Sequence, residues 1–119
     1  MTSPWGMTNM VVSPQLKLAL TELVTALAEH AYERIVIRQW MGRVNAADLD
    51  RVIAEYGATL VRPPDNFIDL SDVFPLSDGS GVLIDIPLWT QEEGRSDLTI
   101  SVLVTSPYET ISINDLRVP

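Results

Sequence analysis

The hydrophobic pattern of this chain changes period once, and that change constrains the fold more than any other feature. Before residue 62 the apolar residues recur at helical spacing, and after residue 65 they alternate with polar residues, as in half-buried strands. The rigid segment Arg62-Pro63-Pro64-Asp65 separates the two parts. Helices that precede a run of strands are typical of an α+β domain, in which helices cover one face of an antiparallel sheet.

Two helices are predicted at the start of the first part. Ser13 can cap a helix that begins with Pro14, a residue tolerated at the first helical position. A second helical pattern runs from about Ala31 to Met41 and stops at Gly42. The sequence leaves open whether it continues the first helix or turns back near residues 29–30. The apolar face of the first helix consists of Leu16, Leu20, Leu23, Val24 and Leu27.

The third helix has the clearest ends. Asn45 is a good N-cap, Asp48 lies three residues later near the positive end of the helix, and Gly57 is a typical C-cap residue. Residues 1–12 are expected to be a flexible segment. Residues 13–119 are predicted to form one domain, which is long enough to bury a substantial core.

The second part of the chain predicts three to five antiparallel strands. Residues 67–74 are the weakest candidate, because two aspartates interrupt them and Pro75 ends them. Residues 82–88 and 98–105 alternate in polarity, and residues 110–118 form the last strand. Two or three helices are thus expected on one face of a β-meander. The opposite face would carry Asp85, Thr99, Ser101, Thr110 and Ser112.

Short polar segments are predicted to reverse the chain between the strands. They lie at 78–81 and 106–109 and contain the glycine, proline, aspartate and serine residues that are typical of tight turns. A bulge near Asn114-Asp115 would let Leu116 and Val118 point into the core.

The formal net charge of −8 is distributed unevenly. Residues 1–60 carry six acidic and five basic side chains, whereas residues 61–119 carry ten acidic side chains and three arginines. A negative surface repels the phosphate backbone of nucleic acids, so binding to DNA or RNA is not expected. A positively charged protein would be attracted to the β-rich half.

Composition disfavours several classes of function and location. The chain has no cysteine, which excludes disulfides, thiolate nucleophiles and cysteine-ligated metals. Its start does not resemble a signal peptide, and its apolar runs are far shorter than the roughly 20 residues of a membrane span. A cytoplasmic protein without cofactor or metal is therefore expected. His30, the single histidine, has no nucleophile elbow or oxyanion loop near it in sequence, so no catalytic residue is predicted.

Residues 88–100, LWTQEEGRSDLTI, combine more kinds of side chain than any other segment. They are predicted to contain a long hairpin connection, with Gly94 at a positive φ. In a structural interpretation Trp89 covers the end of the sheet and Arg95 pairs with a nearby acid. In a functional interpretation the segment binds a partner, because tryptophan and arginine are typical of binding hot spots. The predicted partner-binding residues are Asp85, Trp89, Glu92, Glu93, Arg95 and Asp97.

Two motifs carry a family resemblance. Residues 89–99 follow the pattern W-T-x-E-E-G-R-S-D-L-T, and residues 111–118 follow I-x-I-x-D-L-R-V. Both resemble a bacterial family of small domains of unknown function, which implies an intracellular bacterial protein and no established catalysis. The end of the chain is also similar to the last strand of NTF2-like (cystatin-like) α+β domains. That fold serves enzymes, small-ligand binders and immunity proteins.

Two functions are compatible with the sequence. The favoured one is a non-enzymatic acidic domain that binds a basic protein, in its most specific form an immunity-type antitoxin that neutralises a basic bacterial toxin. The alternative is an NTF2-like enzyme or small-molecule binder with a pocket between helices and sheet. The direction of Trp89 and Arg95 distinguishes the two. The oligomeric state stays open, with a homodimer among the options. The pocket would be lined by Trp40, Tyr56, Trp89, Arg95 and Asp97.

Overall fold

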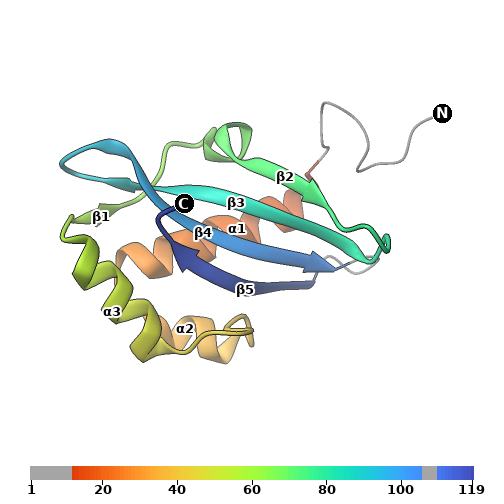
Figure 1. Ribbon diagram of the computed structural model, residues 1–119, viewed down its shortest axis with the longest axis horizontal. Coiled ribbons are helices and arrows are strands. Elements are labelled where there is room, and N and C mark those ends of the chain that lie inside the picture. Colours follow the sequence, from red (N-terminus) through yellow and green to blue (C-terminus); the bar gives the residue numbers. More distant parts are fainter. Residues whose placement is uncertain (1–11, 106–109) are drawn as a thin grey trace.

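The order of elements agrees with the change in hydrophobic period. A computed structural model describes residues 12–105 and 110–119 (Figure 1). The helices are α1 (Pro14–Ala28), α2 (Tyr32–Ile37), α3 (Ala46–Tyr56) and the 3-10 helix η1 (Phe67–Leu70). The strands are β1 (Leu60–Val61), β2 (Asp72–Pro75), β3 (Gly81–Thr90), β4 (Gly94–Thr105) and β5 (Thr110–Arg117). The predicted α+β class, with helices before an antiparallel meander, is confirmed.

All five strands belong to one antiparallel sheet. β4 lies between β3 and β5. β1 and β2 share the other side of β3: β1 pairs with its end, at Trp89 and Thr90, and β2 pairs with its start, at residues 82–85. Strands β2 to β5 therefore form the predicted meander, and β1 is added beside β2 on the edge of β3.

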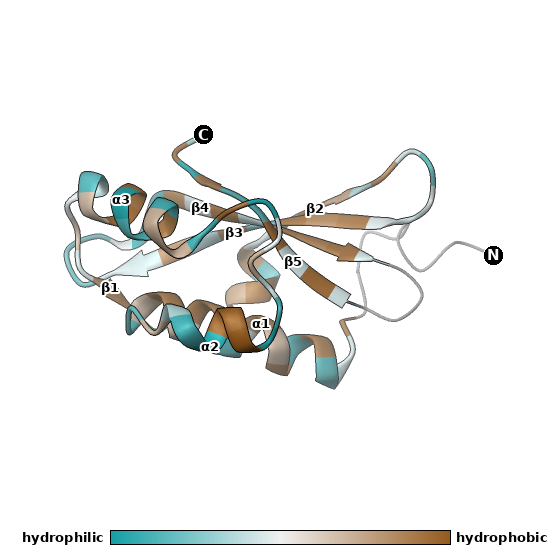
Figure 2. Cartoon of the chain, turned by 90° about the horizontal axis from the view of Figure 1, so that it is seen from below, coloured by the Kyte–Doolittle hydropathy of each residue, from teal (hydrophilic) through white to brown (hydrophobic). Residues whose placement is uncertain are grey.

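The core lies between α1 and one face of the sheet. The hydroxyl of Ser13 accepts a hydrogen bond from the Leu16 amide at 3.0 Å and caps α1, as predicted. The apolar face of α1 and the inward residues of β3, β4 and β5 belong to one buried cluster. Figure 2 shows α1 and α2 in a layer on one side of the sheet, and no helix of the described residues covers the other side.

The chain reverses after α1, so α2 is a separate helix. His30 adopts a left-handed backbone with φ 55°, and Gln39 does the same with φ 62°. Both residues interrupt helical hydrogen bonding, which confines α2 to six residues ending at Ile37 instead of near Met41. The predicted length of this helix is therefore wrong.

The backbone that follows α2 pairs with the sheet instead of continuing the helix. The amide of Ile113 in β5 donates to the carbonyl of Trp40 at 2.8 Å, and the amide of Arg43 donates to the carbonyl of Ile113 at 3.1 Å. Backbone groups of this loop therefore find partners along β5 without belonging to a strand.

Helix α3 has the ends that its sequence predicts. The side-chain oxygen of Asn45 accepts from the amide of Asp48 at 2.8 Å, and Gly57 is the C-cap. Leu49 and Ile53 are its buried residues. This helix lies beside the sheet, near the end of β5 (Figure 1).

Of the predictions for the strands, the structure confirms some and contradicts others. Residues 67–74 form η1 and most of β2 instead of one strand. The register between β4 and β5 skips Asn114, which confirms the predicted bulge. Leu116 is buried behind it, but Val118 follows the strand and is exposed, so its predicted inward position is wrong. The predicted turn at 106–109 and all but the last residue of the predicted flexible segment 1–12 lie outside the described residues.

The loop after α2 predicts a stability effect at Gly42. Its φ is +60°, and a Cβ atom there would collide with the carbonyl oxygen of Ile113. We expect Gly42→Ala to lower the free energy of unfolding by more than about 2 kcal/mol, because the backbone strain of about 1 kcal/mol is added to displacement of the loop. Gly94→Ala is the matched control: its φ is +74° and nothing lies within 4 Å of the added Cβ. It should cost about 1 kcal/mol, and equal losses in chemical denaturation would contradict the close approach at Gly42.

Candidate functional site

The hairpin between β3 and β4 is tighter than its sequence predicts. Thr90 and Gly94 are paired, so only residues 91–93 connect the two strands, and the predicted long connection is wrong. The misleading residues are Thr90 and Ser96, which are polar but buried inside the hairpin. The hydroxyl of Ser96 donates to the carbonyl of Leu88 at 2.8 Å, so its burial leaves no polar group without a partner.

Glu93 and Thr90 close the turn. The hydroxyl of Thr90 accepts from the amide of Glu93 at 2.9 Å and donates to the carboxylate of the same residue at 3.2 Å. Gly94 follows with φ 74°, which confirms the predicted positive φ. These local bonds fix the direction in which the side chain of Glu93 points.

Glu92 connects the turn to Thr59, the residue that directly precedes β1. Its carboxylate accepts from the amide of Thr59 at 2.8 Å and from the hydroxyl of Thr59 at 2.9 Å. The amide of Gln91 donates to the carbonyl of Thr59 at 2.8 Å. The amide of Thr59 is the main reason that the pKa of Glu92 lies below its usual 4.5.

Tyr56, at the end of α3, ties the hairpin to the helical layer. Its hydroxyl donates to the carboxylate of Glu93 at 2.8 Å and accepts from the amide of Asp97 in β4 at 3.2 Å. Burial, and next the bond to Glu93, raise the pKa of Tyr56 above its usual value. The phenol therefore stays protonated and keeps its donor role at neutral pH.

Two predicted partner-binding residues, Glu92 and Glu93, are thus engaged within the chain. They hold the hairpin against α3 and the start of β1. Their partners Thr59 and Tyr56 lie 33 and 37 residues away in sequence, and the spacing of the motif gives no signal for either contact.

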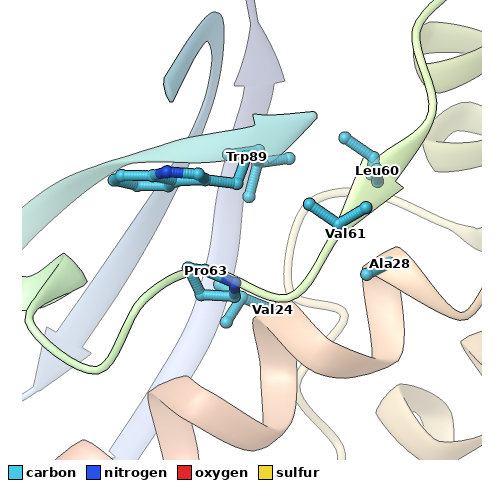
Figure 3. Close-up of a pocket in the computed structure, with 7 residues that line it drawn as sticks. Val24, Ala28, Leu60, Val61, Pro63 and Trp89 are labelled. Carbon is cyan, nitrogen blue, oxygen red and sulfur yellow. The ribbon is translucent and has the colours of Figure 1, made fainter. Parts of the chain in front are cut away.

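Trp89 and Arg95 lie opposite each other at the hairpin end of β3 and β4. Arg95 is exposed and forms no ion pair with the described residues, so its predicted pairing with a nearby acid is wrong. Asp97 is exposed as well. The half-buried indole of Trp89 lies above Pro63 (Figure 3). The crevice that it lines with residues of α1 and β1 has no room for a water molecule.

The uncovered face of the sheet carries a row of acidic residues. Asp72 lies opposite Asp85, and Ser101 lies opposite both Asp85 on one side and Asp115 on the other. The guanidinium of Arg117 reaches over β4, with its nitrogens 3.3 Å from an oxygen of Asp85 and 3.8 Å from an oxygen of Asp115. Arg117 therefore serves two of the three carboxylates, and Asp72 has no cationic partner among the described residues.

An apolar row lies beside the acidic one. Phe74 lies opposite Leu83, and Leu83 lies opposite Leu103. Phe74 is 50% exposed, and the two leucines are partly exposed. We use the term open sheet face for the surface formed by Asp72, Phe74, Leu83, Asp85, Leu103, Asp115 and Arg117.

Two carboxylates on the helical side, Glu22 and Glu29, have arginine partners. Arg38 pairs with Glu22 at 2.6 Å, and Arg34 pairs with Glu29 at 2.9 Å. Arg62 also reaches Glu29, at 3.3 Å. On the open face of the sheet, by contrast, Asp72 and Asp85 lie directly opposite each other and share no cation among the described residues.

His30 takes part in a short polar chain on the helical side. Its Nδ1 lies 3.0 Å from the hydroxyl of Tyr32, which donates to Asp50 at 3.0 Å. Burial, and next the carboxylate of Asp50, raise the pKa of Tyr32 to about 12. Across residues 12–105 and 110–119, no group of three His, Cys, Asp or Glu residues could hold a metal ion.

The five residues of the alternative pocket do not converge. Trp40 belongs to the buried core, whereas Arg95 and Asp97 are exposed at the hairpin. A groove of about 370 Å³ lies elsewhere, between the start of α1 and η1, and is lined by Lys17, Asp65 and their neighbours. None of the five residues predicted for the alternative pocket lines this groove.

The fold and this surface define a small α+β domain whose sheet is covered by helices on one face and open on the other. The chain belongs to the family described as Domain of unknown function (DUF7668), whose model matches residues 24–119. The matched residues begin within α1 and include every strand, together with both motifs of the predicted resemblance. No curated protein and no solved structure matches the chain. No helix in the described ranges is both long and apolar enough to cross a membrane.

The hydroxyl of Tyr56 predicts a local stability effect. Tyr56→Phe removes the bonds to Glu93 and to the amide of Asp97, and we expect it to lower the free energy of unfolding by about 1 kcal/mol. Hydrogen exchange of the Asp97 amide should accelerate more than that of amides in β5. Tyr32→Phe is the matched control, because it removes a bond to Asp50 and leaves the hairpin untouched. Equal exchange at Asp97 in the two variants would show that Tyr56 does not fasten β4.

The depressed pKa of Glu92 predicts a pH effect. A carboxyl with a lowered pKa in the folded state stabilises the fold above its unfolded pKa of about 4.5, and this contribution is lost as the pH falls through the folded pKa. The amide proton resonance of Thr59 should therefore shift with a midpoint below 4.5. Glu92→Gln keeps an acceptor oxygen but cannot titrate, so the shift should disappear. A midpoint at or above 4.5 in the unsubstituted protein would contradict the assigned bond.

Proposed function

We propose that this protein is a non-enzymatic protein-binding domain that presents its open sheet face to a positively charged protein. The observation that carries the proposal is the direct opposition of Asp72 and Asp85 on an uncovered surface. Like charges that face each other across a strand pair destabilise a sheet. A basic partner would remove that cost by supplying the missing cations.

The compensation available within the chain supports this interpretation. Arg117 contacts Asp85 and Asp115, but it is itself 40% exposed, and Asp72 lies on the far side of β3 from it. An arginine or lysine from a partner could approach Asp72 without displacing an internal ion pair. Electrostatic attraction of this kind raises the rate of association and favours partners of the correct charge.

The apolar row supplies the other requirement of a protein interface. Interfaces need a region from which water is excluded, and Phe74, Leu83 and Leu103 provide one beside the carboxylates. Arg95 and Asp97 carry exposed charges at the hairpin end, and Trp89 lies opposite Arg95 in the strand pair. Tryptophan and arginine are types found at binding hot spots. In this proposal Glu92 and Glu93 contribute indirectly, by holding that end of the hairpin in place.

The most specific form of the proposal is an immunity-type antitoxin of a bacterial cytoplasm, which would block a basic toxin. Small size and the negative net charge support it. The NTF2-like pocket has less support, because its five residues are divided between the core and the exposed hairpin.

Asp72 is the residue that tests this proposal. The probe is the protein product of the neighbouring gene, because an immunity protein and its toxin are expected to be encoded together. Asp72→Asn should weaken binding by about tenfold, which corresponds to about 1.4 kcal/mol. The same change should raise the free energy of unfolding by roughly 0.2–1 kcal/mol, because it removes the repulsion of Asp85. Calorimetry and chemical denaturation measure the two effects.

Glu33→Gln provides the matched control for charge. Glu33 is an exposed acid on α2, so its neutralisation changes the net charge equally without touching the sheet. Its affinity for the probe should stay close to that of the unsubstituted protein, and affinity should fall as salt is raised. A neighbouring gene product that is acidic or does not bind, or equal weakening by both substitutions, would count against the proposal.

A further inference from the structure

The helical layer exposes apolar side chains that the core does not use. The run Ile35-Val36-Ile37 occupies a helix of six residues, which can turn only one of the three toward the sheet. Ile35 is fully buried, whereas Val36 is 55% and Ile37 is 77% exposed. Leu18 on α1 is 70% exposed. Large apolar side chains at this level of exposure mark an interaction surface when they lie together.

An ion pair connects the exposed residues of the two helices. Glu22 lies one turn after Leu18 on α1, so the two side chains are neighbours on the helix surface. The Glu22 carboxylate accepts from Arg38 Nε at 2.9 Å and from Arg38 Nη2 at 2.6 Å, and Arg38 follows Ile37 directly. We use the term helical patch for Leu18, Val36, Ile37 and this ion pair. Figure 2 shows α1 and α2 side by side in the layer that contains the patch.

The distribution of charge along the chain indicates that a second copy of the chain could cover the helical patch. Residues 13–44, which include α1 and α2, carry three acidic and four basic side chains, although the whole chain has a net charge of −8. Two copies that met through their sheet sides would bring uncompensated carboxylates together. Two copies that met through the helical layer would not, and the Glu22–Arg38 pair presents both signs of charge to an identical surface.

We propose that two copies of the chain form a dimer through the helical patch, around a two-fold axis. A two-fold interface uses the same surface from each copy, so a patch that carries apolar residues and both charges can be complementary to itself. The open sheet face remains free in such a dimer. The inference is independent of the proposed function and survives if no basic partner exists.

Sedimentation velocity of the full chain tests the dimer. We expect a species of twice the 13.2 kDa mass of one chain, with a dissociation constant between about 1 and 100 µM, as is typical of a small interface. The variant Leu18→Glu with Ile37→Glu should weaken dimerisation by more than about 100-fold, because each change occurs twice in the interface. Ile37→Gln, a milder change at an exposed site, should weaken it by at least about tenfold and leave the circular dichroism spectrum unchanged.

Phe74→Glu with Val118→Glu is the matched control, because it places the same two charges at residues 50% and 53% exposed away from the patch. It should leave the dimer intact. Salt should tighten the dimer by screening the repulsion of two acidic copies, whereas binding of a basic partner should weaken with salt. A monomer at every concentration up to about 500 µM, or a dimer that survives the Leu18 and Ile37 changes but not the control changes, would overturn the inference.

Discussion

The burial of the leucine face of α1 against one face of the sheet is the interaction on which the rest of the structure depends. Each large apolar side chain removed from water contributes roughly 1.5–3 kcal/mol, and a single helix of 15 residues supplies most of the helical side of this contact. One helix cannot cover two faces. The other face therefore remains open, and Thr99 and Ser101 at its centre are shielded by the side chains of neighbouring strands, including the arm of Arg117, instead of by a second layer.

Features that depend on local chemistry could be predicted from the sequence. Ser13 and Asn45 cap helices because their side-chain oxygens reach amides three residues later, and that requirement is visible within a few positions. The alternation of β3, β4 and β5 identified the core face, because strand side chains point to opposite sides in turn. The bulge at Asn114 was also visible, since the apolar spacing shifts by one residue there.

Features that depend on contacts between residues distant in sequence could not be predicted in this way. Thr90 and Ser96 resemble loop residues by composition, but their hydroxyls satisfy buried bonds that appear only when the hairpin is formed. Similarly, Glu92 and Glu93 resemble a free acidic pair until Thr59 and Tyr56 are brought to them by α3 and β1. Among the predicted binding residues, Arg95 and Asp97 have exposed charged groups. Neither group bonds to another side chain among the described residues.

The backbone bonds between the loop after α2 and β5 have a consequence for how the molecule can assemble. A strand at the border of a sheet normally offers free amides and carbonyls to any extended chain that comes near it, which is a common route to aggregation. Here both backbone groups of Ile113 are already occupied by Trp40 and Arg43. The loop therefore blocks the edge of β5 at Ile113, so the β5 edge of a second molecule cannot pair with it at this position.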